Sequence, residues 1–310
     1  MKIALYIPNP ERQQNWTTHL AELLPQHSVI PYDAITNPLE IDIAVVWRPP
    51  TGWLASLENL KLTVSIGAGI DHIMADENYP SNVPVLKTVG PDMAQRMREY
   101  VVLHVLNLHR RMPEIQHNQS DSSWHQLLTP IASSRKIGIM GLGGMGLASA
   151  KALAALDFTV SAWSSSPHEL DGIANYSGDA QLGPFLNQSD ILVCLLPLTE
   201  KTKGILNSSL FQQLPIGASI INAARGAHLL ENDLLEALAS GQLAHATLDV
   251  FAQEPLPEEH PFWSHPKVTV TPHIASLIDP TSGGHIIANN IERFIRGDDL
   301  PDMADTKKRY

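Results

Sequence analysis

Cysteine is almost absent from this chain, because Cys194 is the only one in 310 residues. No disulfide can form within the chain, and such a composition is typical of proteins from a reducing compartment. Cys194 lies inside the apolar run 191–196, where a lone cysteine is more often a small core residue than a nucleophile. We therefore expect a cytoplasmic location and a structural role for Cys194.

Long hydrophobic runs and positive charge are also scarce. No apolar segment reaches the roughly 18 residues of a membrane-spanning helix, and Pro8 ends the first apolar run too early for a signal peptide. The chain has 21 Lys and Arg against 32 Asp and Glu, a formal net charge of -11, and its only dense basic run is Lys307–Arg309. A nucleic-acid-binding protein would show a basic patch. We therefore expect neither a membrane nor a nucleic-acid partner.

The hydrophobic residues, 44% of the chain, fall into short runs that alternate with helical patterns. Such alternation predicts parallel sheets covered by helices. Strands are expected at 3–7, 42–47, 63–66, 83–86, 136–140, 158–163, 190–195, 218–224, 246–250 and 268–271. Helices are expected at 16–24, 91–112, 145–156, 281–296 and 232–240, the last with Asn232 as N-cap and Gly241 after its end, and 113–135 is expected to be a polar loop. The pattern predicts an α/β protein with two doubly wound parallel-sheet domains.

The sharpest motif is a glycine-rich loop between the strand at 136–140 and the helix that follows. It reads Gly141-Leu142-Gly143-Gly144-Met145-Gly146. In a dinucleotide-binding fingerprint the first glycine permits a tight turn, the second lets the backbone approach the pyrophosphate, and the third permits close packing of helix on strand. The free N–H groups and the dipole of the helix N-terminus favour the phosphates. The loop predicts a dinucleotide site; the alternatives are a turn used only for packing and a methyltransferase site for S-adenosylmethionine.

The residues after the next strand bear on the choice of cofactor. NAD sites usually place Asp or Glu there, against the ribose hydroxyls, whereas this chain has Ser164, Ser165 and Ser166. A 2′-phosphate would meet no negative charge, and the serine hydroxyls can donate to it. We therefore expect a mild preference for NADP(H), with NAD(H) possible, because no Arg stands there to bind the phosphate.

Three charged residues follow the later strands: Arg225 after 218–224, Glu254 after 246–250 and His273 after 268–271. Ligands of open α/β sheets bind at this edge. Reduction of a 2-oxo acid by hydride needs a forked guanidinium for the carboxylate and carbonyl oxygen. It also needs a histidine that delivers a proton and a carboxylate that holds the imidazolium. Each residue alone would favour a surface or turn position, so the hypothesis depends on all three.

At these residues the sequence resembles the D-isomer-specific 2-hydroxyacid dehydrogenase family. Five stretches carry the resemblance, in the family's order: Gly141–Gly146, Leu195–Thr199, Asn222–Gly226, Leu248–Phe251 with Glu254-Pro255, and Thr271–His273. Within the family the chain is most similar to bacterial reductases of glyoxylate and hydroxypyruvate, and this similarity rests on 45–50, 66–71, 123–125, 271–276 and 309–310. Those reductases often carry Arg where this chain has Ser165, which leaves the preference for NADPH open.

The resemblance implies a Rossmann cofactor domain, residues 101–277, inserted into a flavodoxin-like substrate domain, residues 1–100 and 278–310. It implies a homodimer that reduces glyoxylate to glycolate and hydroxypyruvate to D-glycerate. His273 is then the acid/base, Glu254 its partner and Arg225 the substrate anchor. Cofactor contacts are implied for Pro197, Thr202, Ala223 and Asp249, and substrate contacts for Ala68 and Gly69. Trp47 is a further candidate for the substrate pocket, and a role in the core is the alternative for it. The turn with Ala68 and Gly69 can present N–H donors to a carboxylate, or it simply joins a strand to a helix.

Weaker signals complete the analysis. Trp124 stands alone as a large apolar residue in its polar loop, which favours a site, a hinge or a subunit contact, and Met93 and Arg96 are lesser pocket candidates. No metal is expected, because Glu258–His260 and His265 match no standard ligand spacing. Two alternative functions stay open: a dehydrogenase of another 2-oxo acid such as pyruvate, and a non-catalytic protein that senses the cofactor.

Overall fold

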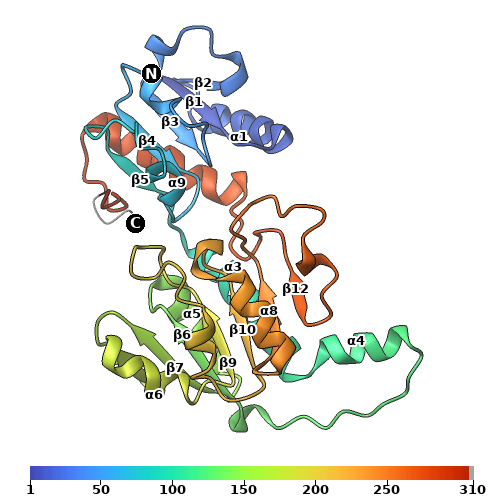
Figure 1. The fold of residues 1–310 in the computed structure, drawn as a ribbon. Helices are drawn as coiled ribbons and strands as arrows, with labels where there is room; N and C mark the ends of the chain where they lie inside the picture. Colours follow the sequence, from blue (N-terminus) through green and yellow to red (C-terminus); the bar gives the residue numbers. More distant parts are fainter. Residues whose placement is uncertain (307–310) are drawn as a thin grey trace. The chain divides into compact units, whose positions relative to one another are not determined.

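The computed structural model describes residues 1–306, so the basic run at 307–309 and the stretch 309–310 lie outside the described residues. The chain divides into two compact units (Figure 1). Unit 1 contains Met1–Asp92 and the chain from Ile278 on, and unit 2 is Met93–Leu277. The sequence-based border at residues 100 and 101 lies inside helix α3 (Pro91–His109).

Unit 1 contains a five-stranded sheet in which all neighbouring strands are parallel. Its strands are β1 (Lys2–Tyr6), β2 (Ser28–Pro31), β3 (Ile43–Val46), β4 (Leu62–Ser65) and β5 (Val85–Lys87). Their order, β2-β1-β3-β4-β5, is the flavodoxin-like order. All residues of β3 and β4 are buried, as expected of central strands in a parallel sheet that is covered on both faces.

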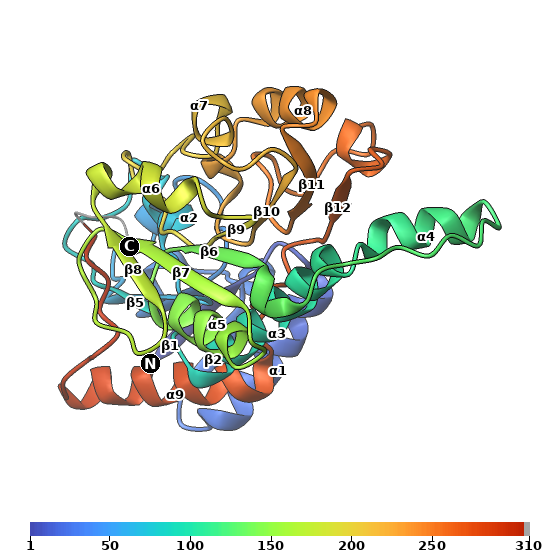
Figure 2. The same cartoon turned by 90° about the horizontal axis from the view of Figure 1, so that it is seen from below.

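The helices of unit 1 have clear end signals. They are α1 (Pro10–Leu23), α2 (Asp71–Met74) and α9 (Pro280–Arg296). The side chains of Asn9 and Asp279 accept backbone N–H groups in the first turns of α1 and α9, and a proline follows each cap. Gly297 ends α9 in the left-handed region, with φ 76°. Helices α1 and α9 pack against each other (Figure 2), so segments from both ends of the chain share unit 1.

Unit 2 contains a seven-stranded parallel sheet. Its strands are β6 (Lys136–Met140), β7 (Thr159–Ser164), β8 (Ala174–Ser177), β9 (Ile191–Cys194), β10 (Ala218–Asn222), β11 (Leu243–Leu248) and β12 (Val268–Val270). The order β12-β11-β10-β9-β6-β7-β8 is the Rossmann order with one strand, β12, added. The order reverses between β6 and β9, and open sheets bind ligands at such a switch point. The predicted fold class, two doubly wound parallel sheets, is confirmed.

The core of unit 2 covers both faces of this sheet. Leu192 and Cys194 of β9 belong to one buried cluster, and Ile191 and Val193 belong to the other, because successive side chains of a strand point to opposite faces. Burial raises the pKa of the Cys194 thiol to about 12. Cys194 is therefore part of the core and is not ionised at neutral pH.

The helices of unit 2 that were predicted at 145–156 and 232–240 each begin one residue earlier than predicted, and two shorter helices, Leu182–Leu186 and Ser208–Phe211, were not predicted. The helices of this unit are α5 (Gly144–Ala154), α6 (Leu182–Leu186), α7 (Ser208–Phe211) and α8 (Glu231–Ser240), besides α3 and α4 (Met112–Ser120). The prediction that Asn232 caps α8 is wrong, because Leu230 stands at the N-cap and provides no side-chain cap. Glu231 and Asp233 lie in the first turn instead, where carboxylates interact favourably with the helix dipole. The predicted end is confirmed, since Gly241 adopts φ 80° after the last residue.

The prediction of one helix over 91–112 is also wrong. Helix α3 ends at His109, and a second helix, α4 (Met112–Ser120), begins after Arg111, which adopts the left-handed region with φ 56°. Pro113 at the second position of α4 is compatible with a helix start and incompatible with a continuing helix. The first part of the predicted loop 113–135 is therefore helical. Helix α4 has no buried residue and projects from the rest of unit 2 in Figure 2.

Two strands were not predicted, β2 and β8. Each is the outermost strand of its sheet at one edge, and neither contains a buried residue. An edge strand of four residues lacks the apolar run that identified the central strands. Their hydrogen-bonding partners, β1 and β7, define them, and these contacts are distant in sequence.

Candidate active site

Three loops at the carboxyl edge of the unit 2 sheet carry the charged residues that the sequence singled out. Arg225 follows β10, Glu254 lies beyond β11 and His273 lies beyond β12. These strands are neighbours and run parallel. Because the carboxyl ends of parallel strands meet at one edge, the three loops are adjacent.

His273 and Glu254 form a hydrogen-bonded pair. The Nδ1 atom of His273 lies 2.7 Å from the Oε2 atom of Glu254. The other carboxylate oxygen, Oε1, accepts the backbone N–H of Phe251 at 3.0 Å, so both oxygens are held. An ionised carboxylate only accepts hydrogen bonds, so Nδ1 carries a proton and Nε2 is the nitrogen turned away from Glu254. The side chains of His273 and Glu254 are 31% and 15% exposed, which leaves the imidazole accessible beside a largely buried partner.

The backbone around His273 is held by Asp249. His273 adopts a left-handed conformation, φ 54°, and its N–H donates to the carbonyl oxygens of Asp249 and Thr271 at 2.8 and 3.0 Å. The Asp249 carboxylate, 1% exposed, accepts the Thr271 hydroxyl at 2.7 Å. It also accepts the N–H groups of Ile274 and Ala275 at 2.9 and 2.8 Å. The predicted cofactor residue Asp249 therefore lies beneath the loop that carries His273.

The backbone of Arg225 is held by two buried side chains. Asn222 donates its amide to the Arg225 carbonyl oxygen at 3.1 Å and accepts the N–H of Ala224 at 3.2 Å. His228 is fully buried, and its Nδ1 accepts the Arg225 N–H at 3.2 Å. Its Nε2 lies 3.2 Å from the carbonyl oxygen of Pro197, which can only accept. His228 therefore connects the Arg225 loop to the Pro197 loop.

Gly226 explains why the loops of Arg225 and Glu254 lie so close. A Cβ atom at Gly226 would lie 1.9 Å from the carbonyl carbon of Phe251, so only glycine fits against that backbone. The half-buried Arg225 side chain donates from Nη1 to the Ala224 carbonyl oxygen at 2.8 Å. The Arg-Gly dipeptide thus places a guanidinium beside the loop that leads to Glu254.

The glycine-rich loop has the geometry of a phosphate cradle. Gly141 adopts φ 102° directly after β6, and a Cβ at Gly146 would lie 1.9 Å from the Gly141 carbonyl oxygen, so both positions require glycine. Helix α5 begins at Gly144, with Gly143 as its N-cap. A Cβ at Gly143 or Gly144 would meet no atom within 4 Å, so the space before this helix terminus is open. The N–H groups there fit a pyrophosphate.

The three serines at the end of β7 and directly after it differ in exposure. Ser164 is buried and its hydroxyl donates to the Ser166 carbonyl oxygen at 2.7 Å, which uses its only proton within the turn. Ser165 and Ser166 are exposed, as is His168 after them. The backbone N–H of His168 donates to Asn175 Oδ1 of β8 at 2.8 Å. Ser165 and Ser166 are therefore the two serines whose hydroxyls face solvent.

The other predicted cofactor residues lie on neighbouring strand ends. The Thr202 hydroxyl donates to the Pro197 carbonyl oxygen at 2.7 Å and accepts the Thr199 N–H at 2.9 Å, so it closes the loop after β9. Ala223 is 7% exposed, and its N–H donates to the Cys194 carbonyl oxygen at 3.3 Å. The loops after β6 and β9 flank the switch point of the sheet.

Trp47, Ala68 and Gly69 lie in unit 1, at the carboxyl ends of β3 and β4. Trp47 is half-buried, and its N–H donates to the Tyr6 carbonyl oxygen at 2.9 Å. A Cβ at Gly67 would lie 3.1 Å from the Trp47 ring, so glycine there lets the indole pack over the turn. The helical pattern that follows Gly69 forms a single turn, α2.

Met93, Arg96 and Trp124 do not share one environment. Met93 is buried in α3, and its carbonyl oxygen accepts the Ser276 hydroxyl at 2.9 Å. Arg96 is exposed one turn later. Trp124 is 95% exposed in the segment after α4.

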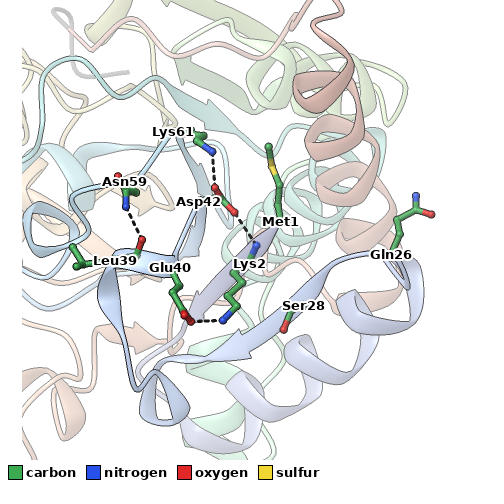
Figure 3. A pocket seen from close by; sticks show the side chains of 9 residues that line it. All are labelled: Met1, Lys2, Gln26, Ser28, Leu39, Glu40, Asp42, Asn59 and Lys61. Atoms are coloured by element: carbon green, nitrogen blue, oxygen red, sulfur yellow. Dashed lines mark hydrogen bonds and ion pairs between the residues drawn. The ribbon is translucent and has the colours of Figure 1, made fainter.

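A hollow of about 630 Å³ lies at the opposite, amino end of the unit 1 strands (Figure 3). Its charged groups neutralise one another, since Lys2 pairs with Glu40 and Lys61 pairs with Asp42 at 2.6 Å. It therefore carries none of the chemistry expected at a carboxyl edge. Within residues 1–306 no group of three His, Cys, Asp or Glu side chains is arranged to bind a metal, and His260 instead contacts Glu231 at 3.2 Å. Among those residues no helix is both long and apolar enough to span a membrane.

Sequence reasoning missed His228 and assigned no individual role to Asn222 or Thr271. All three hold loops that carry predicted site residues. His228 follows Arg225 by three residues, and a polar side chain at that spacing is a known signal of a loop bonded to its own backbone. The contact of Thr271 with Asp249 spans 22 residues, and no local pattern announces it.

The sequence of this chain matches a known protein family. Residues 102–275 match the NAD-binding domain of the D-isomer specific 2-hydroxyacid dehydrogenases. The chain belongs to this family. The family's members are oxidoreductases, and curated relatives include glyoxylate/hydroxypyruvate reductase A of Yersinia enterocolitica, 42% identical, and of Serratia proteamaculans, 43% identical. Each comparison covers 100% of this chain and 100% of the relative.

Solved structures of family members have the same fold. An NADPH-dependent glyoxylate/hydroxypyruvate reductase of Sinorhizobium meliloti, solved with NADP and sulfate, matches with a TM-score of 0.93 and 35% identity over 100% of this chain and 99% of the other. A 2-hydroxyacid dehydrogenase of Xanthobacter autotrophicus, solved with NADPH and MES, matches with a TM-score of 0.91 and 37% identity over the same shares. The expected family is therefore confirmed.

Proposed function

We propose that this chain catalyses the NADPH-dependent reduction of small 2-oxo acids, converting glyoxylate to glycolate and hydroxypyruvate to D-glycerate. The observation that carries the proposal is the 2.7 Å pair of His273 and Glu254 at the sheet edge that also carries Arg225. The relatives' names support the choice of substrates, since those of Yersinia and Serratia are reductases of these two acids.

Arg225 binds and orients the substrate in this proposal. Its planar guanidinium can donate two parallel hydrogen bonds, which suits the adjacent carboxylate and carbonyl oxygens of a 2-oxo acid. Asn222 and His228 hold its backbone, so the guanidinium begins from a fixed Cα position. Such preorganisation favours catalysis because less reorganisation accompanies the reaction.

His273 supplies the proton. A bound nicotinamide would supply the hydride that the carbonyl carbon receives. Negative charge then develops on the carbonyl oxygen, and the Nε2 atom of His273 donates a proton to it. Glu254 stabilises the imidazolium before this transfer through its bond to Nδ1. In the reverse direction Nε2 accepts the hydroxyl proton.

The glycine loop Gly141–Gly146 would hold the pyrophosphate, and Ser165 and Ser166 would face the adenosine ribose. The open space before α5 fits the first role. The absence of Asp or Glu among the residues that end β7 favours a 2′-phosphate, and the NADP and NADPH complexes of the two solved relatives support this cofactor. Trp47, Ala68 and Gly69 are proposed to contact the substrate.

The exposed segment after α4 favours a homodimer. Trp124, Leu128 and Ile131 are 95%, 94% and 72% exposed. Large apolar side chains in such number are characteristic of a protein–protein contact. We propose a second copy of this chain as the partner, and sedimentation of a Trp124→Ser, Leu128→Ser variant should show monomers where the wild-type chain forms dimers. Unchanged dimers would remove this segment from the interface. A cytoplasmic location is proposed from the lone, buried Cys194.

Oxidation of NADPH and NADH by purified protein, with glyoxylate, hydroxypyruvate or pyruvate as acceptor, tests the proposed reaction. Turnover of the first two acids, faster with NADPH, is expected. Turnover of pyruvate alone would favour the alternative dehydrogenase. If no acid is reduced although the cofactor binds, a cofactor-sensing protein becomes the better explanation, and a His273→Ala variant would then retain its binding partner.

A further inference from the structure

A chain of hydroxyl groups leads from helix α3 to the carboxylate beneath the His273 loop. The hydroxyl of Tyr100 lies 2.7 Å from Thr271 Oγ1, across 171 residues of sequence. Thr271 Oγ1 in turn lies 2.7 Å from Asp249 Oδ1. Tyr100 and Asp249 are buried, with 8% and 1% exposure, so no bulk water competes strongly for these bonds.

The donor and the acceptor of each hydrogen bond in this series can be assigned. The Asp249 carboxylate accepts two backbone N–H groups and the Thr271 hydroxyl. Thr271 has a single hydroxyl proton, and that proton points to Asp249, so Thr271 can only accept from Tyr100. Burial and the nearby charge of Asp249 raise the pKa of Tyr100, so its phenol keeps the proton that it donates.

The orientation of Tyr100 is itself fixed. Its ring packs on His104, one turn later in α3, with ring centroids 4.2 Å apart. Met93, at the start of the same helix face, accepts the hydroxyl of Ser276 through its carbonyl oxygen at 2.9 Å. Helix α3 therefore holds the segment 271–276 at two positions, one on each side of His273.

We propose that Tyr100 and Thr271 are positioning residues that hold His273 in its working orientation through Asp249. The inference rests on the role of His273 proposed above. His273 has an unfavourable left-handed backbone, and its N–H bonds to the carbonyl oxygens of both Asp249 and Thr271. Weakening the bonds of Asp249 to its loop therefore lets this backbone relax and moves the imidazole from the reacting oxygen.

The substitutions Tyr100→Phe and Thr271→Val remove one hydroxyl each with little change in shape. We expect kcat to fall about 10-fold for Tyr100→Phe and about 100-fold for Thr271→Val, as is typical when a catalytic group is displaced by about 1 Å. The dissociation constant of NADPH should stay within about twofold, because neither residue touches the glycine loop. Thr271→Ser keeps the hydroxyl and should restore most of the lost kcat.

A double-mutant cycle tests directly whether Tyr100 acts through Thr271. In the Thr271→Val background Tyr100 has already lost its acceptor, so adding Tyr100→Phe should lower kcat no further. If the two losses in kcat multiply in the double variant, Tyr100 does not act through Thr271, and the inference is overturned. Tyr176→Phe is the matched control. Tyr176 lies in β8, at the opposite edge of the sheet from β12, and its hydroxyl accepts a hydrogen bond from Gln188. Removing this hydroxyl should leave kcat unchanged.

Amide hydrogen exchange of the cofactor-free protein supplies a readout that does not depend on the substrate. Exchange at Ile274 and Ala275 should accelerate in Tyr100→Phe and Thr271→Val, and should be normal in Thr271→Ser and Tyr176→Phe. Normal exchange and full kcat in Tyr100→Phe would overturn the inference. If the wild-type protein reduces no 2-oxo acid, the proposed function fails, and the exchange result still decides whether Tyr100 holds this loop.

Discussion

The carboxyl ends of β10–β12 and the turn after β7 belong to one sheet but are built differently. At β10–β12 every proposed catalytic residue is bonded to a second side chain or backbone group, much of it buried. After β7, Ser165, Ser166 and His168 are exposed, and none of them is an Arg or Lys. The comparison indicates that the fold holds the proposed catalytic residues in place, whereas the serines proposed to face the ribose are exposed to solvent.

The largest effect is expected at His273. The substitution His273→Asn keeps a polar side chain but removes the proton donor, so kcat should fall about 100- to 10,000-fold. The measurement is the rate of NADPH oxidation with glyoxylate, with NADPH affinity determined separately and unchanged. His285→Asn, an exposed histidine on α9, serves as the control and should retain full kcat. Retention of kcat in His273→Asn would remove the residue from the reaction.

A smaller loss is expected at Arg225. Arg225→Lys replaces a fork with a point charge, so the KM for the oxo acid should rise about 10- to 100-fold, the equivalent of one charge-assisted hydrogen bond. Steady-state kinetics at saturating NADPH measures this. An unchanged KM would show that the carboxylate is anchored elsewhere.

At the turn after β7, by contrast, we expect a substitution to strengthen the binding of NADPH. Ser165→Arg adds a cation where a 2′-phosphate is proposed to lie, and the ratio of NADH to NADPH dissociation constants should rise about fivefold, typical of an exposed ion pair. Fluorescence titration of both cofactors gives the ratio. Ser165→Gln controls for size, and equal ratios in the two variants would mean that the phosphate lies elsewhere.

The smallest expected effect concerns the stability of the fold and depends on His245 in β11. Burial, with the nearby His265 and His104, lowers the pKa of His245 from 6.5 to about 4. The unfolded chain therefore binds a proton that the folded chain excludes, and the stability present above pH 6.5 is lost as the pH falls towards 4. Between pH 7 and 5.5 this amounts to about 1 kcal/mol, or a Tm lower by about 2–4 °C. His245→Gln should flatten this part of the profile of Tm against pH, and an unchanged slope would contradict the assignment.

The same contrast explains what could be predicted from the sequence. Central strands such as β9 and β10 have continuous apolar runs, and the glycine loop has a local signature, so both were found without structural information. The edge strands β2 and β8 have no buried residue and gave no signal. The helix break at Arg111 depends on a left-handed residue that is neither Gly nor Asn, and only Pro113 hinted at it.

The candidate site divides in a similar way. Arg225, Glu254 and His273 were found because each follows a recognisable strand. Tyr100 was missed, because its bond to Thr271 joins segments that are distant in sequence. Local patterns report on elements and on their ends, whereas a hydrogen-bond network depends on how those elements pack.

The stereochemistry of the product tests the central claim most directly. Hydroxypyruvate is reduced with NADPH by the purified protein, and the glycerate formed is resolved on a chiral column. We predict D-glycerate, in keeping with a D-specific 2-hydroxyacid dehydrogenase whose proton comes from His273. Formation of L-glycerate, or no glycerate while NADPH binds, would contradict the account.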